Sequence, residues 1–197
     1  MIQKIRTIIQ TLMFVTIAAF SVGCYHIYNQ QSIAMAGETH IALPDFEHTN
    51  NQQFLDNVNQ CVDYWYHNTT DVYPVNRELL LAQAALESGW GNSRFALEGK
   101  NLFGIRTYNL TEPHMLPSNN PKKWGVKVYQ HECDSVLNYI NILNTGSAYK
   151  KYRELIENGE TSPYILVETL DAYAADKHYF SKIKSILTKI RKEYKIK

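Results

Sequence analysis

The chain has 197 residues, of which 45% are hydrophobic and 20% are charged. This length and composition suit one globular domain with its own core and a terminal tail. The formal net charge is only +1, which argues against a nucleic-acid-binding protein, because such proteins usually carry a concentrated basic face.

Residues 1–24 have the pattern of an export segment. Lys4 and Arg6 precede an apolar run from about Ile8 to Gly23, and its length is intermediate between a signal peptide and a thin membrane anchor. Residues 21–24, Ser-Val-Gly-Cys, resemble a lipoprotein cleavage box in which Cys24 would be lipidated. Anchor, lipoprotein and cleaved signal peptide all remain open. Each places the rest of the chain outside the cytoplasm, so we expect a cell-envelope location on the periplasmic side.

Residues 25–45 are mostly polar and are interrupted by Pro44, so we predict a linker there and a folded domain over 46–197. The first element of this domain is predicted to be an amphipathic helix, because apolar residues recur every three or four positions. These residues are Phe54, Leu55, Val58, Cys61, Val62 and Trp65. We expect this helix to end near Asn68.

A second helix is predicted from Arg77 to about Glu87, with Asn76 as its N-cap. The helix is apolar on almost every side, so we expect it to be buried at the centre of the domain. Gly89 and Gly91 follow directly and end it.

Residues 100–130 contain several Pro, Gly and Asn residues, and only 124–129 alternate enough to suggest a short strand. Beyond this region we expect a helix capped by Asp134 or Ser135, helices over about 148–157 and 163–171, and a last helix from about His178. The predicted fold class is mainly α: a helical bundle around a central buried helix, with a small β or irregular lobe.

The three cysteines are Cys24, Cys61 and Cys133. In an oxidising compartment Cys61 and Cys133 could form a disulfide. The alternative is two separate buried thiols, because Cys61 lies on an apolar helix face, and we favour this alternative. No Cys/His spacing resembles a zinc site, so we expect neither a metal nor a cofactor.

Glu87 ends the buried helix, in the stretch Leu-Glu-Ser-Gly-Trp-Gly. The helix dipole and apolar surroundings both oppose ionisation of a carboxyl group at this point and so raise its pKa. A glycosidase needs such a carboxyl group to protonate the leaving oxygen. The alternative is an exposed, structural Glu87 that pairs with Arg94.

Three segments resemble the glucosaminidase-type domain of glycoside hydrolase family 73. They are residues 83–93 (Gln-Ala-Ala-Leu-Glu-Ser-Gly-Trp-Gly-Asn-Ser), residues 101–105 (Asn-Leu-Phe-Gly-Ile) and residues 172–179 (Ala-Tyr-Ala-Ala-Asp-Lys-His-Tyr). The turn Met115-Leu116-Pro117 is similar to that of the Bax-type branch. The resemblance covers about residues 75–187 and implies a lysozyme-like fold with the β lobe over a glycan groove. It also implies a peptidoglycan hydrolase that cleaves at N-acetylglucosaminyl linkages.

The resemblance implies roles for individual residues. It makes Glu87 the catalytic acid, puts Tyr173 near the reacting sugar, and places the segment of Asn101 and Phe103 beside the acid in the groove. We expect Asn101 to bind sugar or to orient Glu87, and Phe103 to be part of the groove wall or the core rather than a direct sugar ligand. Trp90 is either a sugar platform or a plug of the helix end.

Tyr108 is expected to line the groove. Many family members carry a second glutamate in the β lobe, and the motif that contains it is missing from this sequence. Glu112 is the only carboxylate between Ile105 and Lys127, so it is the second catalytic candidate. Otherwise the substrate's own N-acetyl oxygen could attack the anomeric carbon, supported by Tyr173.

Two further functions remain open: a lytic transglycosylase, which needs no second carboxylate, and a non-catalytic module that binds peptidoglycan. In each case the expected partners are glycan strands and, through the N-terminal segment, a membrane. We expect the protein to be a monomer and not to bind nucleic acid.

Overall fold

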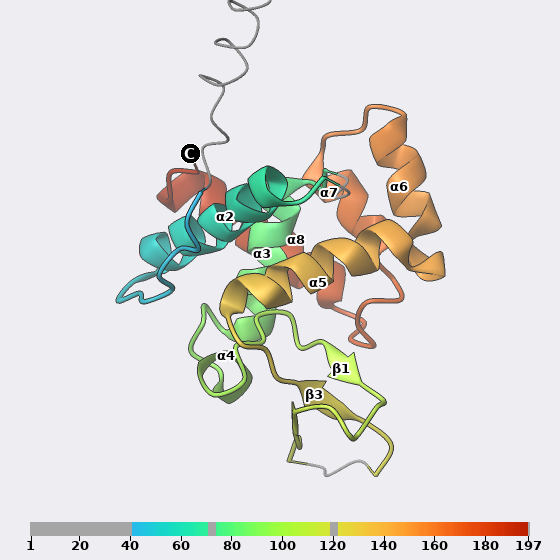
Figure 1. Ribbon diagram of the computed structural model, residues 1–197. Coiled ribbons are helices and arrows are strands. Elements are labelled where there is room, and N and C mark those ends of the chain that lie inside the picture. Colours follow the sequence, from blue (N-terminus) through green and yellow to red (C-terminus); the bar gives the residue numbers. More distant parts are fainter. Residues whose placement is uncertain (1–40, 71–73, 119–121, 197) are drawn as a thin grey trace, which may run out of the picture. The chain divides into compact units, whose positions relative to one another are not determined.

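The computed structural model describes residues 41–70, 74–118 and 122–196 (Figure 1). The predicted export segment, including Cys24, and most of the predicted linker lie outside these residues. None of the helices in the described ranges is long and apolar enough to span a membrane.

The domain is built around helix α3, Arg77–Ser88. This helix packs against α2 (Asn51–Asn68) and α8 (Tyr179–Glu193), and α2 packs in turn against α5 (Glu132–Thr145) (Figure 1). The shorter elements are α4 (Arg94–Leu97), α6 (Lys150–Glu157), α7 (Pro163–Leu166) and the 3-10 turns Ser147–Tyr149 and Val167–Thr169. The helices predicted from apolar periodicity are therefore confirmed, with the expected helix over 163–171 divided into α7 and a 3-10 turn.

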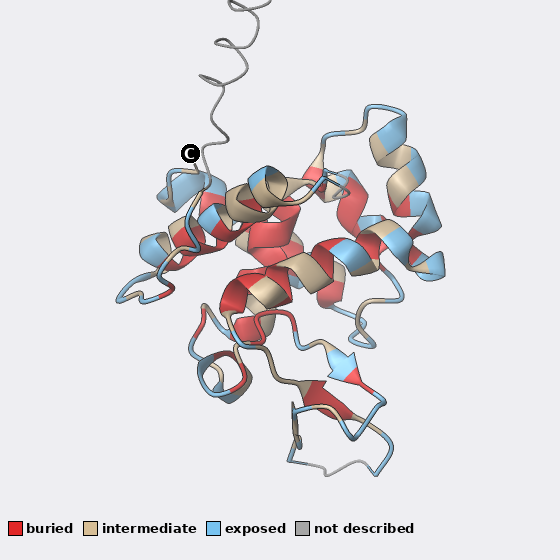
Figure 2. Cartoon of the chain, viewed as in Figure 1, coloured by how far each residue is buried: buried red, intermediate tan, exposed pale blue. Residues whose placement is uncertain are grey.

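Helix α3 has a capped start and a glycine end. The Asn76 side chain accepts a hydrogen bond from the backbone N–H of Leu79, and Gly89 closes the helix in the left-handed region with φ of 58°. Every residue from Leu79 to Ala85 is buried, and Figure 2 shows this helix as the centre of the core. Because burying one leucine side chain contributes roughly 1.5–3 kcal/mol, the three consecutive leucines of α3 anchor the fold.

Helix α5 begins differently from the prediction. Its N-cap is His131, whose Nδ1 accepts from the backbone N–H of Cys133 at 3.0 Å. Asp134, which we expected as a cap, is instead the third helical residue, and its carboxylate accepts from the backbone N–H of His131 at 3.0 Å. The two bonds form a capping box, so both donors at the helix start are satisfied.

The small lobe is a three-stranded antiparallel sheet of order β1-β3-β2. Its strands are β1 (Arg106–Thr107), β2 (His114–Met115) and β3 (Gly125–Lys127). Strand β3 lies inside the predicted stretch 124–129, and Val126 pairs with Arg106 on one side and Met115 on the other. The two outer strands are too short to show a period in the sequence.

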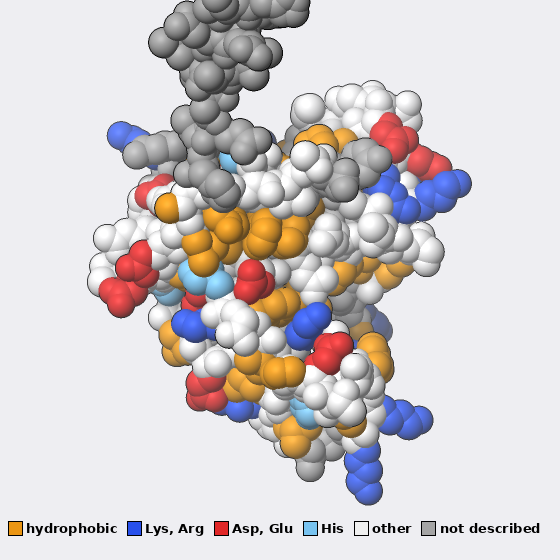
Figure 3. All heavy atoms as spheres, in the orientation of Figure 1, with side chains coloured by type: hydrophobic (Ala, Val, Ile, Leu, Met, Phe, Trp, Pro, Cys, Tyr) orange, Lys and Arg blue, Asp and Glu red, His pale blue; other side chains and the backbone are white. Residues whose placement is uncertain are grey.

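Charged side chains of both signs lie on the surface of the described residues (Figure 3). On the face drawn in Figure 3, acidic and basic side chains are interspersed. Many basic residues near the C-terminus are paired: Lys182 with Asp176, Lys184 with Glu168, and Arg191 with Glu78. This distribution agrees with the low net charge.

Candidate active site

Glu87 lies in the last turn of α3, half-buried, with the 101–105 loop against it. Gly104 faces the carboxyl: a Cβ placed on this glycine would lie 3.7 Å from Oε2 of Glu87, in ordinary van der Waals contact. Arg94 does not pair with Glu87: its guanidinium contacts Glu98 at 3.8 Å and donates to the carbonyl of Leu116 at 2.7 Å. The alternative of a structural Glu87–Arg94 pair is therefore wrong.

The surroundings of Glu87 favour its protonated form. Burial raises the pKa of this carboxyl, whereas a hydrogen bond from Tyr179 and the positive charge of Lys182 lower it, and burial dominates. The raised pKa has the direction expected for a general acid, and desolvation is its main cause.

Asn101 holds the loop beside Glu87 and has no capacity left for a sugar. Its side chain is 1% exposed, and its amide nitrogen donates to the carbonyls of Ile105 at 2.9 Å and Lys127 at 2.8 Å. Its oxygen accepts from the backbone N–H of Phe103 at 3.3 Å and of Ile105 at 3.0 Å. An amide has two donor hydrogens and two acceptor sites, so these bonds saturate it. The expectation of Asn101 as a sugar ligand is therefore corrected to a loop-positioning role.

Phe103 belongs to the core. Its ring is 2% exposed and stacks on Tyr139, with ring centroids 4.2 Å apart. The structure therefore makes Phe103 a core residue, which is a role that we favoured, and corrects its alternative role as a direct sugar ligand. Its carbonyl oxygen, however, accepts a hydrogen bond from the hydroxyl of Tyr173 at 3.0 Å.

Tyr173 lies close enough to Glu87 for the two side chains to interact electrostatically. It is half-buried, and the negative charge of Glu87 helps to raise the pKa of its hydroxyl after the larger effects of burial and Tyr179. The ring of Tyr173 stacks on that of Tyr179 at a centroid distance of 5.8 Å. The structure thus brings Tyr173, Tyr179 and the 101–105 loop together around the carboxyl group.

Trp90 matches the second of its two predicted roles, that of a plug at the helix end. Its ring lies 6.3 Å from Phe54 and 5.6 Å from Tyr194, with the ammonium of Lys189 5.4 Å above it. The Trp90 carbonyl lies 3.1 Å from a ring nitrogen of His48. These contacts tie the turn after α3 to α2 and α8.

Glu112 and Tyr108 both lie in the small lobe. The Glu112 carboxylate accepts from Thr107 at 3.3 Å and Asn109 at 3.2 Å and lies 3.9 Å from Nζ of Lys127. Tyr108 is 73% exposed, and its place in the groove stays a prediction.

Two residues of the site were not singled out from the sequence. Tyr179 hydrogen-bonds Glu87, and Gln83 hydrogen-bonds Tyr179 with a distance of 2.6 Å between its amide nitrogen and the hydroxyl oxygen. Both lie within the quoted motifs, Gln83 one helical turn before Glu87 and Tyr179 at the end of segment 172–179. A polar side chain inside an otherwise apolar helix was the available signal for Gln83.

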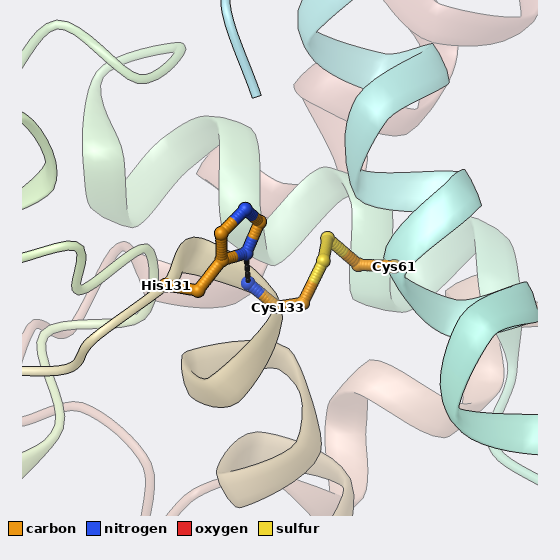
Figure 4. A group of neighbouring side chains, drawn as sticks. All are labelled: Cys61, His131 and Cys133. Atoms are coloured by element: carbon orange, nitrogen blue, oxygen red, sulfur yellow. Dashed lines mark hydrogen bonds between the residues drawn. A yellow bond between two sulfur atoms is a disulfide. The ribbon is translucent and has the colours of Figure 1, made fainter. Parts of the chain in front are cut away.

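Among the described residues, one group of side chains has metal-ligand types close together: Cys61, His131 and Cys133 (Figure 4). The two sulfurs form a disulfide between α2 and α5, with Cα atoms 4.9 Å apart. Our favoured alternative of two separate thiols is therefore wrong. Because a thiolate is the form that binds metal, the disulfide leaves this group unable to act as a cysteine metal site.

Comparisons with known proteins agree with this geometry. Residues 65–192 match the family described as mannosyl-glycoprotein endo-beta-N-acetylglucosaminidase. The exo-glucosaminidase LytG of Bacillus subtilis (strain 168) is 27% identical over 148 residues, which is 70% of this chain and 51% of that protein. The chain therefore spans about half the length of this curated relative.

Solved structures share the fold. The catalytic domain of the autolysin Auto from Listeria monocytogenes matches with a TM-score of 0.55 and 23% identity, covering 83% of this chain and 94% of that one. The C-terminally truncated glycoside hydrolase domain of FlgJ from Salmonella typhimurium matches with a TM-score of 0.51 and 22% identity, covering 72% and 98%. These matches confirm the predicted fold class. With the family match over residues 65–192, the chain belongs to the glucosaminidase family of glycoside hydrolases.

Proposed function

We propose that this chain hydrolyses the glycan strands of peptidoglycan at N-acetylglucosaminyl linkages, with Glu87 as the general acid. The observation that carries the proposal is the half-buried Glu87 carboxyl, whose pKa is raised mainly by burial. Its neighbours Gly104 and Tyr173 come from the segments that resemble the family's glycan groove. The B. subtilis relative, named an exo-glucosaminidase, supports the same sugar.

In this mechanism Glu87 donates its proton to the glycosidic oxygen as the bond from that oxygen to the anomeric carbon breaks. The leaving sugar departs as an alcohol, and water adds to the anomeric carbon and loses a proton. Tyr173, next to Glu87, is the side chain that we propose to hold the N-acetyl group of the reacting sugar.

The electrostatic environment of Glu87 bears on how water is activated. Within the described ranges, Lys182 is the charged side chain that shifts the pKa of Glu87, and no second carboxylate contributes. A retaining pair of carboxyls about 5 Å apart would perturb each other strongly. We therefore propose either attack by the substrate's N-acetyl oxygen, or activation of water by a more distant group, for which Glu112 is the candidate.

The lack of a second carboxylate among the described groups that shift the pKa of Glu87 also fits a second function, that of a lytic transglycosylase. Such an enzyme needs one acid/base residue and ends its glycan products in a 1,6-anhydro ring. Both functions place the protein in the cell envelope, and we propose export through residues 1–24 as anchor, lipoprotein or cleaved signal peptide.

The test is digestion of purified sacculi by wild type and by Glu87→Gln. Glu98→Gln is the matched control, because the Glu98 side chain is 62% exposed and pairs with Arg94. We expect Glu87→Gln to lose activity by about 100-fold or more and Glu98→Gln to keep it. Full activity in Glu87→Gln would contradict the proposal, and sacculus binding by an inactive wild type would favour a non-catalytic module.

Mass spectrometry of the products separates the reaction types. Hydrolysis at N-acetylglucosaminyl linkages leaves that sugar at the reducing end. Products ending in anhydromuramic acid, lighter by one water, would establish a transglycosylase instead. Release of single sugars rather than longer fragments would indicate the exo mode named for the relative.

A further inference from the structure

Gln83 is a fully buried amide inside α3, among the consecutive buried residues of that helix. Burying an amide without partners is costly, yet both ends of this side chain are satisfied. The hydroxyl of Tyr139, on α5, donates to its oxygen, and its nitrogen donates to the hydroxyl of Tyr179, on α8, at 2.6 Å. One side chain therefore fixes two tyrosine hydroxyls from two other helices.

These bonds determine where the proton of Tyr179 goes. Because the Tyr179 oxygen already accepts from Gln83, its own O–H is left to donate, and the Glu87 carboxyl is the group whose pKa a hydrogen bond from Tyr179 lowers. The chain Tyr139–Gln83–Tyr179–Glu87 thus runs in one direction, with each group donating to the next. Burial keeps the pKa of both tyrosine hydroxyls well above the ordinary value, so neither loses its proton while the enzyme works.

A donor aimed at a carboxylate stabilises its ionised form, whereas burial stabilises the protonated form. A general acid gives up its proton in each turnover and must then regain it, so both forms have to be accessible. In addition, a donor held in place by Gln83 limits rotation of the carboxyl group and fixes the direction of its other oxygen.

We propose that Gln83 and Tyr139 are positioning residues that hold the Tyr179 hydroxyl against Glu87, and that this chain sets the orientation and proton affinity of the acid. The inference rests on the proposed function, in which Glu87 is the acid. Of the other described groups that face Glu87, Lys182 comes from α8 and Tyr173 from the preceding loop, while the 101–105 loop presents Gly104, which does not titrate.

The test uses Tyr179→Phe and Gln83→Met in the full chain. The phenylalanine keeps the ring that stacks on Tyr173, and the methionine keeps the length of the buried side chain. The matched control is Tyr194→Phe, which removes a hydroxyl that accepts from Asn51 at 3.0 Å, outside the chain of donors. Two quantities are measured: the pH dependence of kcat and KM on glycan chains released from sacculi, and the carboxyl carbon-13 NMR titration of Glu87, assigned by its loss in Glu87→Gln.

We expect Tyr179→Phe to lower kcat on the order of 10-fold or more, with a smaller effect on KM, because the acid is less well placed. Without the donor the protonated carboxyl is favoured, so the alkaline limb of the pH profile and the NMR titration should both move to higher pH. Gln83→Met should shift them in the same direction and the control should not. A purely structural role would reduce stability without moving either.

An unchanged Glu87 titration in Tyr179→Phe overturns the inference. This outcome is distinct from failure of the proposed function, which would appear as an active Glu87→Gln. The NMR titration reports on the chain of donors even if Glu87 proves not to be the acid.

Discussion

Removing the disulfide between Cys61 and Cys133 should strongly destabilise the domain. The two residues are 72 positions apart, so the bond closes a long loop in the unfolded chain. Chain entropy for a loop of that length corresponds to about 4 kcal/mol at 25 °C. This amount is a large fraction of the total stability of a typical domain, roughly 5–15 kcal/mol.

The effect is measured by urea unfolding of the oxidised and reduced wild type, followed by tryptophan fluorescence. With a slope of about 2 kcal/mol per M, the loss of about 4 kcal/mol lowers the midpoint by roughly 2 M. The variant Cys61→Ala/Cys133→Ala should behave like the reduced protein and should not respond to reductant. In denaturant the oxidised full-length chain, purified without lipidation, should show one reactive thiol, Cys24, of its three cysteines.

Equal urea midpoints for the oxidised and reduced protein would contradict stabilisation by the disulfide. Three reactive thiols in the oxidised chain would contradict the disulfide itself. In the first case the unfolded chain would already be compact enough for the bond to matter little. In the second the two sulfurs would not be joined.

Other changes test the loop and the acid. Asn101→Ala should cost about 2–4 kcal/mol in thermal unfolding, because it leaves buried backbone groups of the 101–105 loop unpaired, and a loss below about 0.5 kcal/mol would contradict this role. Gly104→Ala should cost about 1 kcal/mol in thermal unfolding, because φ of Gly104 is +63°, whereas its methyl group would meet Oε2 of Glu87 only at an ordinary 3.7 Å. An unchanged stability would contradict the left-handed backbone at this position. Glu87→Gln should raise the free energy of unfolding at pH 7 but not at about pH 3.5. The pKa of Glu87 is raised in the folded state, so the protonated carboxyl stabilises the fold at pH below the ordinary pKa of 4.5, and this stabilisation is lost as the pH rises. Equal effects at both pH values would show that burial does not disfavour the charge.

The burial of Glu87 and the direction of its pKa shift were predictable, because both depend on residues near it in the sequence. Glu87 stands at the end of a strongly apolar helix, so burial and the sense of its pKa shift followed from neighbours within a few residues. The helices themselves were predictable from apolar periodicity, which reports the buried face directly.

The remainder depends on contacts between distant positions. Asn101 owes its role partly to the carbonyl of Lys127, 26 residues away at the end of β3, and no local sequence pattern predicts that bond. The disulfide joins α2 to α5, and the spacing of the two cysteines in the sequence does not determine how these helices pack. His131 caps α5 although Ser, Thr, Asp and Asn are the usual caps, because Asp134 completes the capping box from inside the helix.

Proton donation from Glu87 to the leaving sugar is tested most directly by comparing wild type and Glu87→Gln on two glycosides of the same sugar. One glycoside carries a natural sugar leaving group, and the other carries an acidic nitrophenol that departs without protonation. We predict that Glu87→Gln lowers kcat/KM for the natural leaving group by about 10²–10⁴-fold and for the nitrophenol far less. Equal losses on both substrates would contradict the account, because they would mean that Glu87 acts at a step other than protonation of the leaving oxygen.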